Sequence, residues 1–254
     1  MNILFDSYTI PKDKVIYMRT VILGRGKMGK MLESILVKQG FEVLGFLTEE
    51  NYEELSHTTQ VLFDFSHTSK LVLLDKFLSL CNCSVIIGTT GYSKEQYTLL
   101  QYFGRTHRVC YSSNYSTGIQ VMNRMVQIVL PYVMHEYDIE IIEAHHRYKQ
   151  DAPSGTVQLF LDTIKRNDTF TEVYGRCGMV GKREREEIGV HSVRGGTHIG
   201  THHIYFMGDN EEIMITHHTL DKAVYAYGAI QAWELLEKRE CGFFEYQELL
   251  FQGE

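Results

Sequence analysis

The first half of the chain alternates short apolar runs with segments whose apolar residues recur every three or four positions. The apolar runs predict buried strands, and the helical spacing predicts helices between them. Strands are predicted at 20–23, 41–47, 61–65, 85–87 and 108–111, and helices from Met28 to Gly40, at 71–80 and at 94–103. Strands and helices that alternate at this length are typical of an α/β fold with a doubly wound parallel sheet.

The pattern changes after Asn114. A helical stretch at 118–133 leads to an apolar strand at 139–143, and a last helix is predicted at 221–238. Between them lie more polar strands, with a turn at Asp209 and Asn210; these strands are 189–193, 202–207 and 212–216. Consecutive strands of this kind predict an antiparallel arrangement in a second sheet.

The chain has 254 residues, of which 44% are hydrophobic and 22% charged, which suits one large domain or two small ones. No apolar run approaches the roughly 18 residues of a membrane helix, and a formal net charge of -7 disfavours a general nucleic-acid binder. We therefore expect neither a membrane nor a nucleic acid as partner. Five cysteines without zinc or redox spacing, and no signal-peptide pattern, favour a cytoplasmic protein with reduced thiols.

A glycine-rich turn follows the first predicted strand. Residues 24–29 read G-x-G-x-x-G, and a helix is predicted directly after it. Such glycines allow a tight turn and a close approach to a pyrophosphate, whose charge the helix amides attract. Glu49 follows the second strand, where an acid that binds ribose belongs. The pattern favours dinucleotide binding over an ordinary turn between strand and helix.

Two later strands also end in polar or glycine-rich turns. These are Gly88-Thr89-Thr90-Gly91 and Ser112-Ser113-Asn114-Tyr115. Each alone reads equally well as a plain turn. Because ligands of open α/β sheets bind along the carboxyl edge of the strands, three such turns on one edge favour a cofactor site.

The densest candidate chemistry lies between Glu143 and Thr156. His145 is a residue type that donates protons near neutral pH, and Lys149 is a cation for a carboxylate. Ser154-Gly155-Thr156 precedes a predicted helix at 157–165, whose free amides suit an anionic group. The segment therefore predicts a small anionic substrate that needs proton transfer, although solvated surface residues would also fit.

Histidine pairs leave a metal site as an alternative, since imidazoles are common ligands. No H-E-x-x-H spacing is present, and adjacent histidines on a strand face opposite sides. The candidates are His145, His146, His202, His203, His217 and His218.

The segment 193–197 contains Arg194 and two glycines, and it reads either as a loop that brings a cation to the substrate or as a hairpin with an exposed arginine. Cys110 reads as a buried thiol, because no base neighbours it in the sequence.

Several of these motifs occur together in one family. From about Thr20 to its C-terminus, the chain resembles the 4-hydroxy-tetrahydrodipicolinate reductases, also called dihydrodipicolinate reductases, of bacterial diaminopimelate and lysine biosynthesis. The resemblance lies in EIIEAHHRYKQDAPSGT (140–156), GTTG (88–91), SSNYSTG (112–118) and SVRGG (192–196). It implies that NADH or NADPH reduces a cyclic imine dicarboxylate, dihydrodipicolinate, which forms from 4-hydroxy-tetrahydrodipicolinate, to tetrahydrodipicolinate.

The resemblance also implies a domain organisation and an assembly. A Rossmann-like dinucleotide-binding domain would comprise 1–115 and 220–254, because the C-terminal helix typically returns to the first domain. A substrate-binding and oligomerisation domain with a mixed sheet would comprise 116–219, and a homotetramer would form through that sheet.

Site residues follow from the resemblance position by position. His145 is the expected proton donor and Lys149 a second catalytic or substrate-orienting cation, and no metal is expected. Substrate would also contact His146, Ser154, Gly155, Thr156 and, from the loop at 193–197, Arg194. The cofactor would contact Gly24, Gly26, Lys27, Met28, Gly29, Glu49, Gly88, Thr89, Thr90, Ser112, Ser113, Asn114 and Tyr115.

The chain departs from the common family pattern in places. Gly200-Thr201-His202 stands where Gly-Glu-His is frequent, and the glycine loop is one residue shorter. Both changes leave 145–149 intact. Glu49 and Glu50, with no cation between 48 and 56, predict that NADH is used at least as well as NADPH. In the alternative, Arg25 and Lys27 of the glycine loop reach the 2′-phosphate and favour NADPH.

Two other functions fit parts of the pattern. A non-catalytic dinucleotide-sensing regulatory protein would need the glycine loop but not His145, Lys149 and the Ser-Gly-Thr turn together. An aldehyde-type dehydrogenase would need a reactive cysteine in its second domain, and Cys177 stands in no evident motif.

Overall fold

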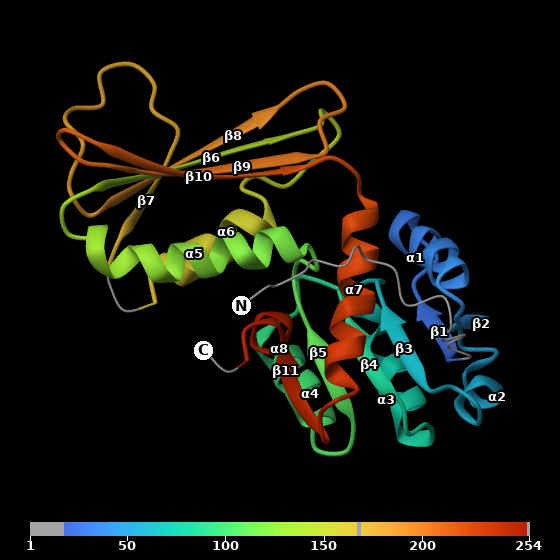
Figure 1. The fold of residues 1–254 in the computed structure, drawn as a ribbon. Helices are drawn as coiled ribbons and strands as arrows, with labels where there is room; N and C mark the ends of the chain where they lie inside the picture. Colours follow the sequence, from blue (N-terminus) through green and yellow to red (C-terminus); the bar gives the residue numbers. More distant parts are fainter. Residues whose placement is uncertain (1–17, 167–168, 253–254) are drawn as a thin grey trace, which may run out of the picture. The chain divides into compact units, whose positions relative to one another are not determined.

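The structure, a computed structural model, describes residues 18–166 and 169–252 (Figure 1). Within these residues the chain forms two compact units. The first contains the residues up to Ser112 and those from Ala226 onward, and the second runs from Ser113 to Tyr225. The chain therefore leaves the first unit once and returns to it through its last long helix.

The first unit contains a six-stranded parallel sheet in the order β11-β5-β4-β3-β1-β2. The strand order reverses between β1 and β3, the position at which Rossmann-like sheets bind their ligands. Its elements are β1 (Arg19–Leu23), α1 (Lys27–Lys38), β2 (Glu42–Phe46), α2 (Tyr52–Ser56), β3 (Val61–Asp64), the 3-10 helix η1 (Thr68–Lys70), α3 (Leu71–Leu80), β4 (Ser84–Ile87), α4 (Lys94–Phe103), β5 (Arg108–Tyr111), most of α7 (Ala223–Leu236), β11 (Gly242–Glu245) and α8 (Tyr246–Leu250).

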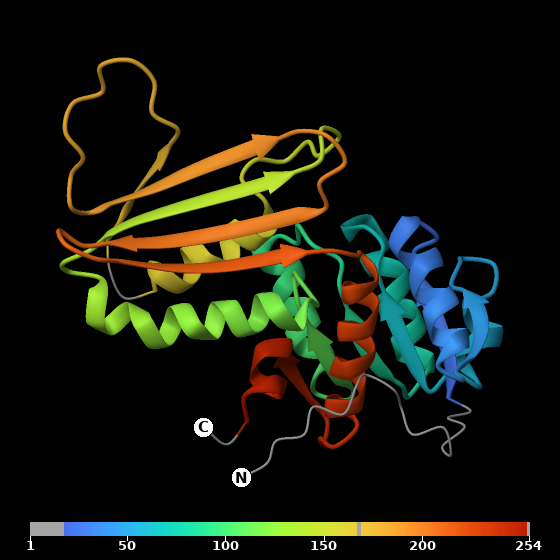
Figure 2. The same ribbon diagram turned by 45° about the horizontal axis from the view of Figure 1, so that its top comes forward.

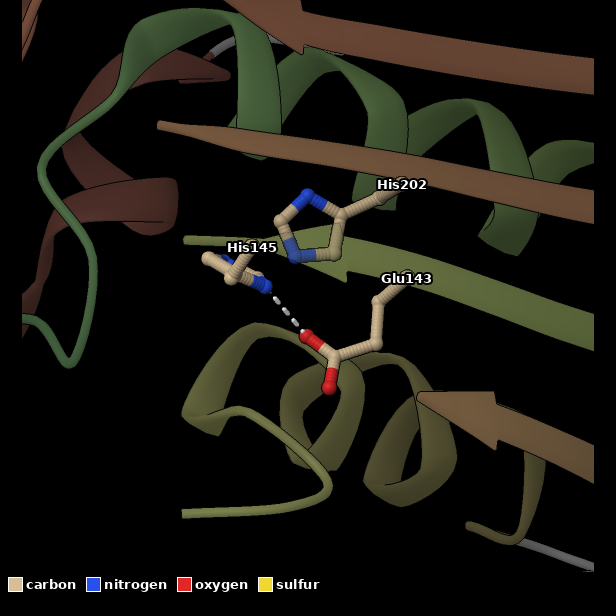
Figure 3. Close-up of side chains that lie close together, drawn as sticks. All are labelled: Glu143, His145 and His202. Atoms are coloured by element: carbon tan, nitrogen blue, oxygen red, sulfur yellow. Dashed lines mark ion pairs between the residues drawn. The ribbon is translucent and has the colours of Figure 1, made fainter. Parts of the chain in front are cut away.

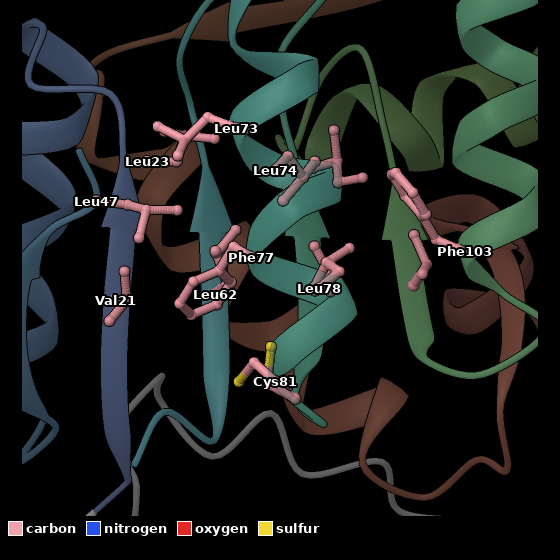
Figure 4. Close-up of a cluster of buried hydrophobic side chains, with 14 of the residues drawn as sticks. Val21, Leu23, Leu47, Leu62, Leu73, Leu74, Phe77, Leu78, Cys81 and Phe103 are labelled. Carbon is pink, nitrogen blue, oxygen red and sulfur yellow. The ribbon is translucent and has the colours of Figure 1, made fainter. Parts of the chain in front are cut away.

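The core of this unit lies between the sheet and its helices. One buried cluster joins alternate residues of the strands with the inner face of α3 (Figure 4). Parallel strands that are covered on both faces read as nearly continuous apolar runs, which is why the sequence shows them clearly. The cluster includes Val21, Leu62, Leu74, Phe77 and Val85.

The second unit contains a mixed five-stranded sheet in the order β10-β9-β6-β8-β7. The helices α5 and α6 cover one face of this sheet, and its other face carries no helix (Figure 2). Its elements are α5 (Thr117–Val133), β6 (Asp138–His145), α6 (Gly155–Ile164), β7 (Thr171–Tyr174), β8 (Glu187–Arg194), β9 (Gly200–Met207) and β10 (Glu212–Thr219).

The predicted direction of the strand at 189–193 is wrong. β8 runs parallel to both β6 and β7, and only β9 and β10 are antiparallel to their neighbours. The reason is the connections: α6 carries the chain back to the start of β7, and the long loop after β7 does the same for β8. Parallel neighbours need such crossovers. The pattern also missed the short elements α2, β7, β11 and α8, each of four or five residues.

The borders between the units differ from the predicted ones by a few residues. Asn114 donates from Nδ2 to Oγ1 of Thr156 at 2.9 Å, and Oγ of Ser116 accepts from the amide of Ile119. These bonds attach the segment after Ser112 to α5 and α6. Three predicted cofactor-binding residues, Ser113, Asn114 and Tyr115, therefore belong to the second unit.

No helix in the described parts of the chain has the length and apolarity that a membrane crossing requires.

Candidate active site

The register of the second sheet gathers polar side chains on its helix-covered face. Glu143 and His145 lie two residues apart on β6 and are both buried, so they share the face of the strand's apolar residues. Glu143 lies opposite Ser192 on β8 and His202 on β9, and His145 lies opposite Arg194. The buried face of the sheet thus ends in a polar cluster.

Glu143 lies at the centre of this cluster. Its Oε2 is 2.6 Å from Nδ1 of His145 (Figure 3), and its side chain is 0% exposed. Arg194 and the hydroxyl of Ser192 donate to its Oε1 at 2.6 and 2.7 Å. Burial raises the pKa of Glu143, but its contacts with His145 and Arg194 outweigh burial and hold that pKa well below its usual range. The carboxylate is therefore ionised at neutral pH.

His202 is the second imidazole of the cluster. Its ring meets that of His145 edge-on, with the centroids 5.2 Å apart. Burial, and then the charge of His145, lower the pKa of His202 to about 3. His202 is therefore neutral at physiological pH, whereas His145 has the carboxylate of Glu143 beside it.

Glu143, His145 and His202 are also the residues to consider for the alternative of a metal site. Glu143, His145 and His202 hold ligand atoms within 4.8 Å of one another. The guanidinium of Arg194, however, already binds one oxygen of Glu143 and would repel a cation there. The six histidines considered as ligands do not converge either, because His203 lies on the opposite face of β9, where it bonds to Thr216. The arrangement suits a proton better than a metal ion.

The loop after β6 holds Lys149 near the end of the strand. Its Nζ lies 2.9 Å from Oδ2 of Asp151. Burial raises the pKa of Asp151, but Lys149 outweighs it and lowers that pKa. The amide of Gly195 donates to the carbonyl of His145 at 2.9 Å, and that of Arg147 to the carbonyl of Gly196 at 3.2 Å. These bonds tie the loop after β6 to the loop after β8.

The first turn of α6 suits an anion. Ser154 caps the helix by accepting from the amide of Val157, and its Oγ lies 3.4 Å from Nε2 of His202. No acidic side chain occupies the first turn, and a side chain added at Gly155 would meet no atom within 4 Å. Open amides at a helix start attract negative charge. Thr156, also predicted to bind substrate, is buried in this turn.

Three further residues of the candidate site differ in how they are held by the protein. Arg194 is engaged within the protein, because its Nη2 donates to Glu143 and to the carbonyl of Asp151 and its Nη1 to the carbonyl of Val193. His146 is half-buried, and its Nδ1 has no hydrogen-bond partner among the described residues. Thr201, at the position where glutamate is frequent, lies 2.6 Å from Nε2 of His198 through its hydroxyl.

Sequence reasoning did not single out Glu143 or Ser192 as functional residues. The sequence did contain a signal for Glu143. This residue continues the two-residue period of the apolar side chains in a buried strand, so its carboxyl group must be buried and needs a polar partner. The partners themselves come from other strands, which no local pattern reveals.

In the first unit, the glycine turn after β1 has the shape of a phosphate cradle. Gly24 has φ +107°, and a Cβ there would lie 2.4 Å from the carbonyl oxygen of Phe65. A Cβ on Gly29 would lie 1.8 Å from the carbonyl oxygen of Gly24, whereas one on Gly26 would meet nothing within 4 Å. α1 starts at Lys27, with Met28 in its first turn, and has neither a side-chain cap nor an acid there. The turn therefore fits a pyrophosphate.

A buried carboxyl group joins the ends of β3 and β4. Asp64 is 1% exposed and accepts hydrogen bonds from the hydroxyls of Ser66, Thr89 and Tyr92 at 2.5, 2.9 and 3.2 Å. Burial raises the pKa of Asp64. Asp64 was not among the predicted site residues. Its hydrogen bonds fix the turn that holds the predicted cofactor residues Gly88, Thr89 and Thr90.

Lysines from other segments lie near the predicted ribose-binding acid and the residue after it. Glu49 pairs with Nζ of Lys76 at 3.2 Å. A hydrogen bond from Thr48, and to a smaller extent the charge of Lys70, lower the pKa of Glu50. Both lysines come from other segments of the chain, so the charge around Glu49 is more balanced than its sequence neighbours indicate.

Models of two known domain families match the chain. The N-terminal domain of dihydrodipicolinate reductase matches residues 18–115, and its C-terminal domain matches 118–250. With the Rossmann-like sheet of the first unit, these matches define an oxidoreductase that uses a pyridine nucleotide. The chain belongs to the dihydrodipicolinate reductase family, which acts in lysine and diaminopimelate biosynthesis. Nothing in the comparisons supports the regulatory-protein alternative.

Individual relatives agree with this assignment. A 4-hydroxy-tetrahydrodipicolinate reductase of Clostridium novyi (strain NT) is 36% identical over 239 residues, which cover 89% of this chain and 94% of that protein. One of Staphylococcus saprophyticus is 34% identical and covers 91% and 100%. The solved dihydrodipicolinate reductase from Paenisporosarcina sp. TG-14, described as dipicolinate-bound, shares the fold with a TM-score of 0.73 at 19% identity, covering 91% and 98%.

Proposed function

We propose that His145 is the proton donor of the reductase reaction and that Lys149 and the start of α6 bind the carboxylates of a dicarboxylate substrate. The observation that carries the proposal is the pair of Glu143 and His145, buried beside the capping residue Ser154. A bound NADH or NADPH supplies the hydride. The second unit supplies the proton for the negative charge that develops on the substrate ring, and it orients that ring.

The substrate class is supported by charge and shape. Lys149 offers a cation, and the first turn of α6 offers open amides beside Gly155. Dipicolinate, which the Paenisporosarcina protein binds, carries a carboxylate on each side of a ring nitrogen. We propose that His146, Ser154 and Thr156 complete the same recognition, and that Arg194 contributes through its bonds to the loop carbonyl of Asp151.

Substitutions at two positions test the roles. His145→Gln should lower kcat by roughly 100-fold or more, because a general acid is lost, while KM changes little. Lys149→Ala should lower kcat and also raise KM. Binding of NADH, measured by calorimetry, should be unchanged in both variants, since the glycine turn belongs to the other unit. Near-normal turnover of His145→Gln would remove it from the mechanism.

We further propose that the cofactor lies on the glycine turn and along the carboxyl edge of the parallel sheet. There the amides of Gly26, Lys27 and Met28 would bind the pyrophosphate, Glu49 would bind the ribose, and Thr89, Thr90 and Ser112 would contact the cofactor farther along the edge. The open space at Gly26 supports this placement. We propose that Ser113, Asn114 and Tyr115 contact the cofactor as well.

Both nucleotides should be used. Lys76 offsets the charge of Glu49, so a 2′-phosphate meets less repulsion than the two carboxylates alone would cause. We expect the kcat/KM values for NADH and NADPH to differ by less than tenfold, about 1.4 kcal/mol, with NADH at least equal. Lys76→Gln should shift the ratio several-fold further toward NADH. An unchanged ratio in this variant would mean that Lys76 does not act on the nucleotide.

We also propose a homotetramer that forms through the helix-free face of the second sheet. Alternation along β8, β9 and β10 puts apolar side chains there, and three of them, Val193, Met207 and Met214, are 52%, 36% and 52% exposed. Exposed apolar side chains among the polar residues of such a face suit a subunit interface. A cytoplasmic location is proposed as well, because all five cysteines are free.

A further inference from the structure

No binding or catalytic role has been proposed above for Glu143, yet its ionised side chain is 0% exposed. Its Oε2 and Nδ1 of His145 are both buried, and among the described residues their ion-pair contact is the one that either atom makes. They lie 2.6 Å apart, so each is the nearest polar partner of the other. A buried carboxylate without a partner is strongly destabilising, so this pair fixes the orientation of the imidazole.

The other nitrogen of the ring lies beside Gly200. A Cβ on Gly200 would lie 3.1 Å from Nε2 of His145, a distance that would crowd the ring. Glycine at this position therefore avoids a side chain next to Nε2. One ring nitrogen thus lies beside the carboxylate of Glu143, and the other lies beside a residue without a side chain.

From this geometry we propose that Glu143 is the positioning residue for His145: it binds the proton on Nδ1 and so makes Nε2 the nitrogen that delivers the proton to the substrate. The proposal rests on the proton-donor role proposed for His145. When Nε2 gives up its proton to the carbanionic ring of the reduced substrate, His145 becomes a neutral imidazole that carries its remaining proton on Nδ1. The hydrogen bond that one nitrogen makes decides where the other acts.

Arg194 acts on the other oxygen of the same carboxylate. Its Nη2 donates to Oε1 at 2.6 Å, and Ser192 donates to the same atom. These donors keep Glu143 charged and leave Oε2 to His145. Arg194 is thus a supporting residue that acts through Glu143, which explains why its guanidinium is bound within the protein.

The other charged or titratable groups around His145 come from several elements. His202 on β9 packs against its ring, and Arg194 on β8 binds Glu143. His217 on β10 and Lys149 in the loop after β6 act on the neighbouring His202. Burial lowers the pKa of both His202 and His217, and they therefore add little charge at neutral pH. Glu143 is thus the anion closest to the imidazolium, and its removal should destabilise that charged form.

The decisive measurement is the pH profile of kcat for Glu143→Gln. We expect kcat at neutral pH to fall tenfold or more, and the midpoint at which kcat declines toward high pH to move down by about one unit, with KM for NADH unchanged. Glu140→Gln is the matched control, because Glu140 forms a second glutamate–histidine pair, with His191 at 2.8 Å, on the opposite face of β6. Its midpoint should not move.

A spectroscopic readout separates this proposal from the proton-donor role. In ¹⁵N-histidine-labelled protein, neutral His145 should carry its proton on Nδ1, and in Glu143→Gln it should lose that preference; the signal is assigned with His145→Gln. An unshifted kcat midpoint together with the same tautomer in both proteins overturns the proposal. Normal turnover of His145→Gln would instead overturn the proton-donor role.

A second variant covers the case that Glu143→Gln does not fold. Glu143→Asp keeps a charge for Arg194 but shortens the side chain by one methylene. It should reduce kcat less than the glutamine variant and retain the Nδ1 tautomer in part. Full activity and an unchanged midpoint in Glu143→Asp would show that the reach of the carboxylate to His145 does not matter.

Discussion

Glu143 and His202 share one small volume, and different neighbours give them different charges. Arg194 and His145 keep the carboxylate ionised in spite of its burial. His202 has no acid of its own within hydrogen-bond reach among the described residues, and burial keeps it neutral. At the scale of a residue, function depends on the nearest partner. The imidazoles of His145 and His202 lie close together, yet their different partners give them different roles.

The neutral state of His202 has a consequence for stability. In the unfolded chain it binds a proton near pH 6.5, but in the folded protein its pKa is about 3. Below pH 6.5 the unfolded state therefore binds more protons, and stability falls as the pH drops, by at most about 1.4 kcal/mol per unit. His202→Asn should make the free energy of unfolding depend less on pH between 6.5 and 4.5. This interval lies above the pH range in which most carboxyl groups titrate.

Chemical denaturation at several pH values measures this slope. His203→Asn is the control, because His203 is the adjacent residue but lies on the opposite, more exposed face of β9. An equal slope in wild type and His202→Asn would contradict the prediction.

At the scale of an element, the start of α1 shows how three glycines serve different needs. Gly24 adopts a positive φ beside Phe65, and Gly29 packs against the carbonyl of Gly24. Gly26 has space around it and an ordinary φ of -72°. The first two are required by the fold, whereas the third leaves room that a pyrophosphate would use.

Two alanine variants separate these needs. Gly29→Ala should lower the melting temperature by about 5 °C or more, because its Cβ would overlap a backbone oxygen. Gly26→Ala should change stability by no more than about 1 kcal/mol, but weaken NADH binding tenfold or more. Thermal unfolding without nucleotide and calorimetric titration with NADH measure the two effects. Tight binding by Gly26→Ala would place the pyrophosphate elsewhere.

At the scale of the whole molecule, the second unit is asymmetric. α5 and α6 cover one face of its sheet, while no helix of the described part of this unit lies on the other face (Figure 2). The same alternation that turns His202 inward turns His203 and Tyr205 outward. The helix-free face is therefore free for another copy of the chain.

Tyr205→Glu tests the assembly. A charge in the middle of β9 on this face should convert the proposed tetramer to smaller species, because burial of an unpaired charge is costly. Tyr132→Glu on α5 is the matched control, since Tyr132 is 83% exposed on the opposite side of the unit. Light scattering coupled to size exclusion gives the mass. The same mass for wild type and Tyr205→Glu would argue against this face as the interface.

Local patterns were sufficient for much of the fold and for the class of chemistry. The helices Leu71–Leu80 and Lys94–Phe103 and the strand Arg108–Tyr111 lie where the apolar periodicity predicts them, because burial on one face imposes that period on the sequence. The glycine turn and the segment from His145 to Thr156 are continuous in the chain, so their spacing alone indicates a dinucleotide and an anionic substrate.

Only the tertiary structure decides what depends on contacts between distant segments. Arg194 reaches Glu143 across 51 residues, and Lys76 reaches Glu49 across 27. The arrangement of the elements in space places these pairs. For example, β8, which carries Arg194, runs parallel to β6, which carries Glu143. The sequence by itself thus determined the longer elements and most of the residue types of the candidate site. The fold decided their charges and partners, because electrostatic energies depend on distance in space and on burial, which sequence separation does not express.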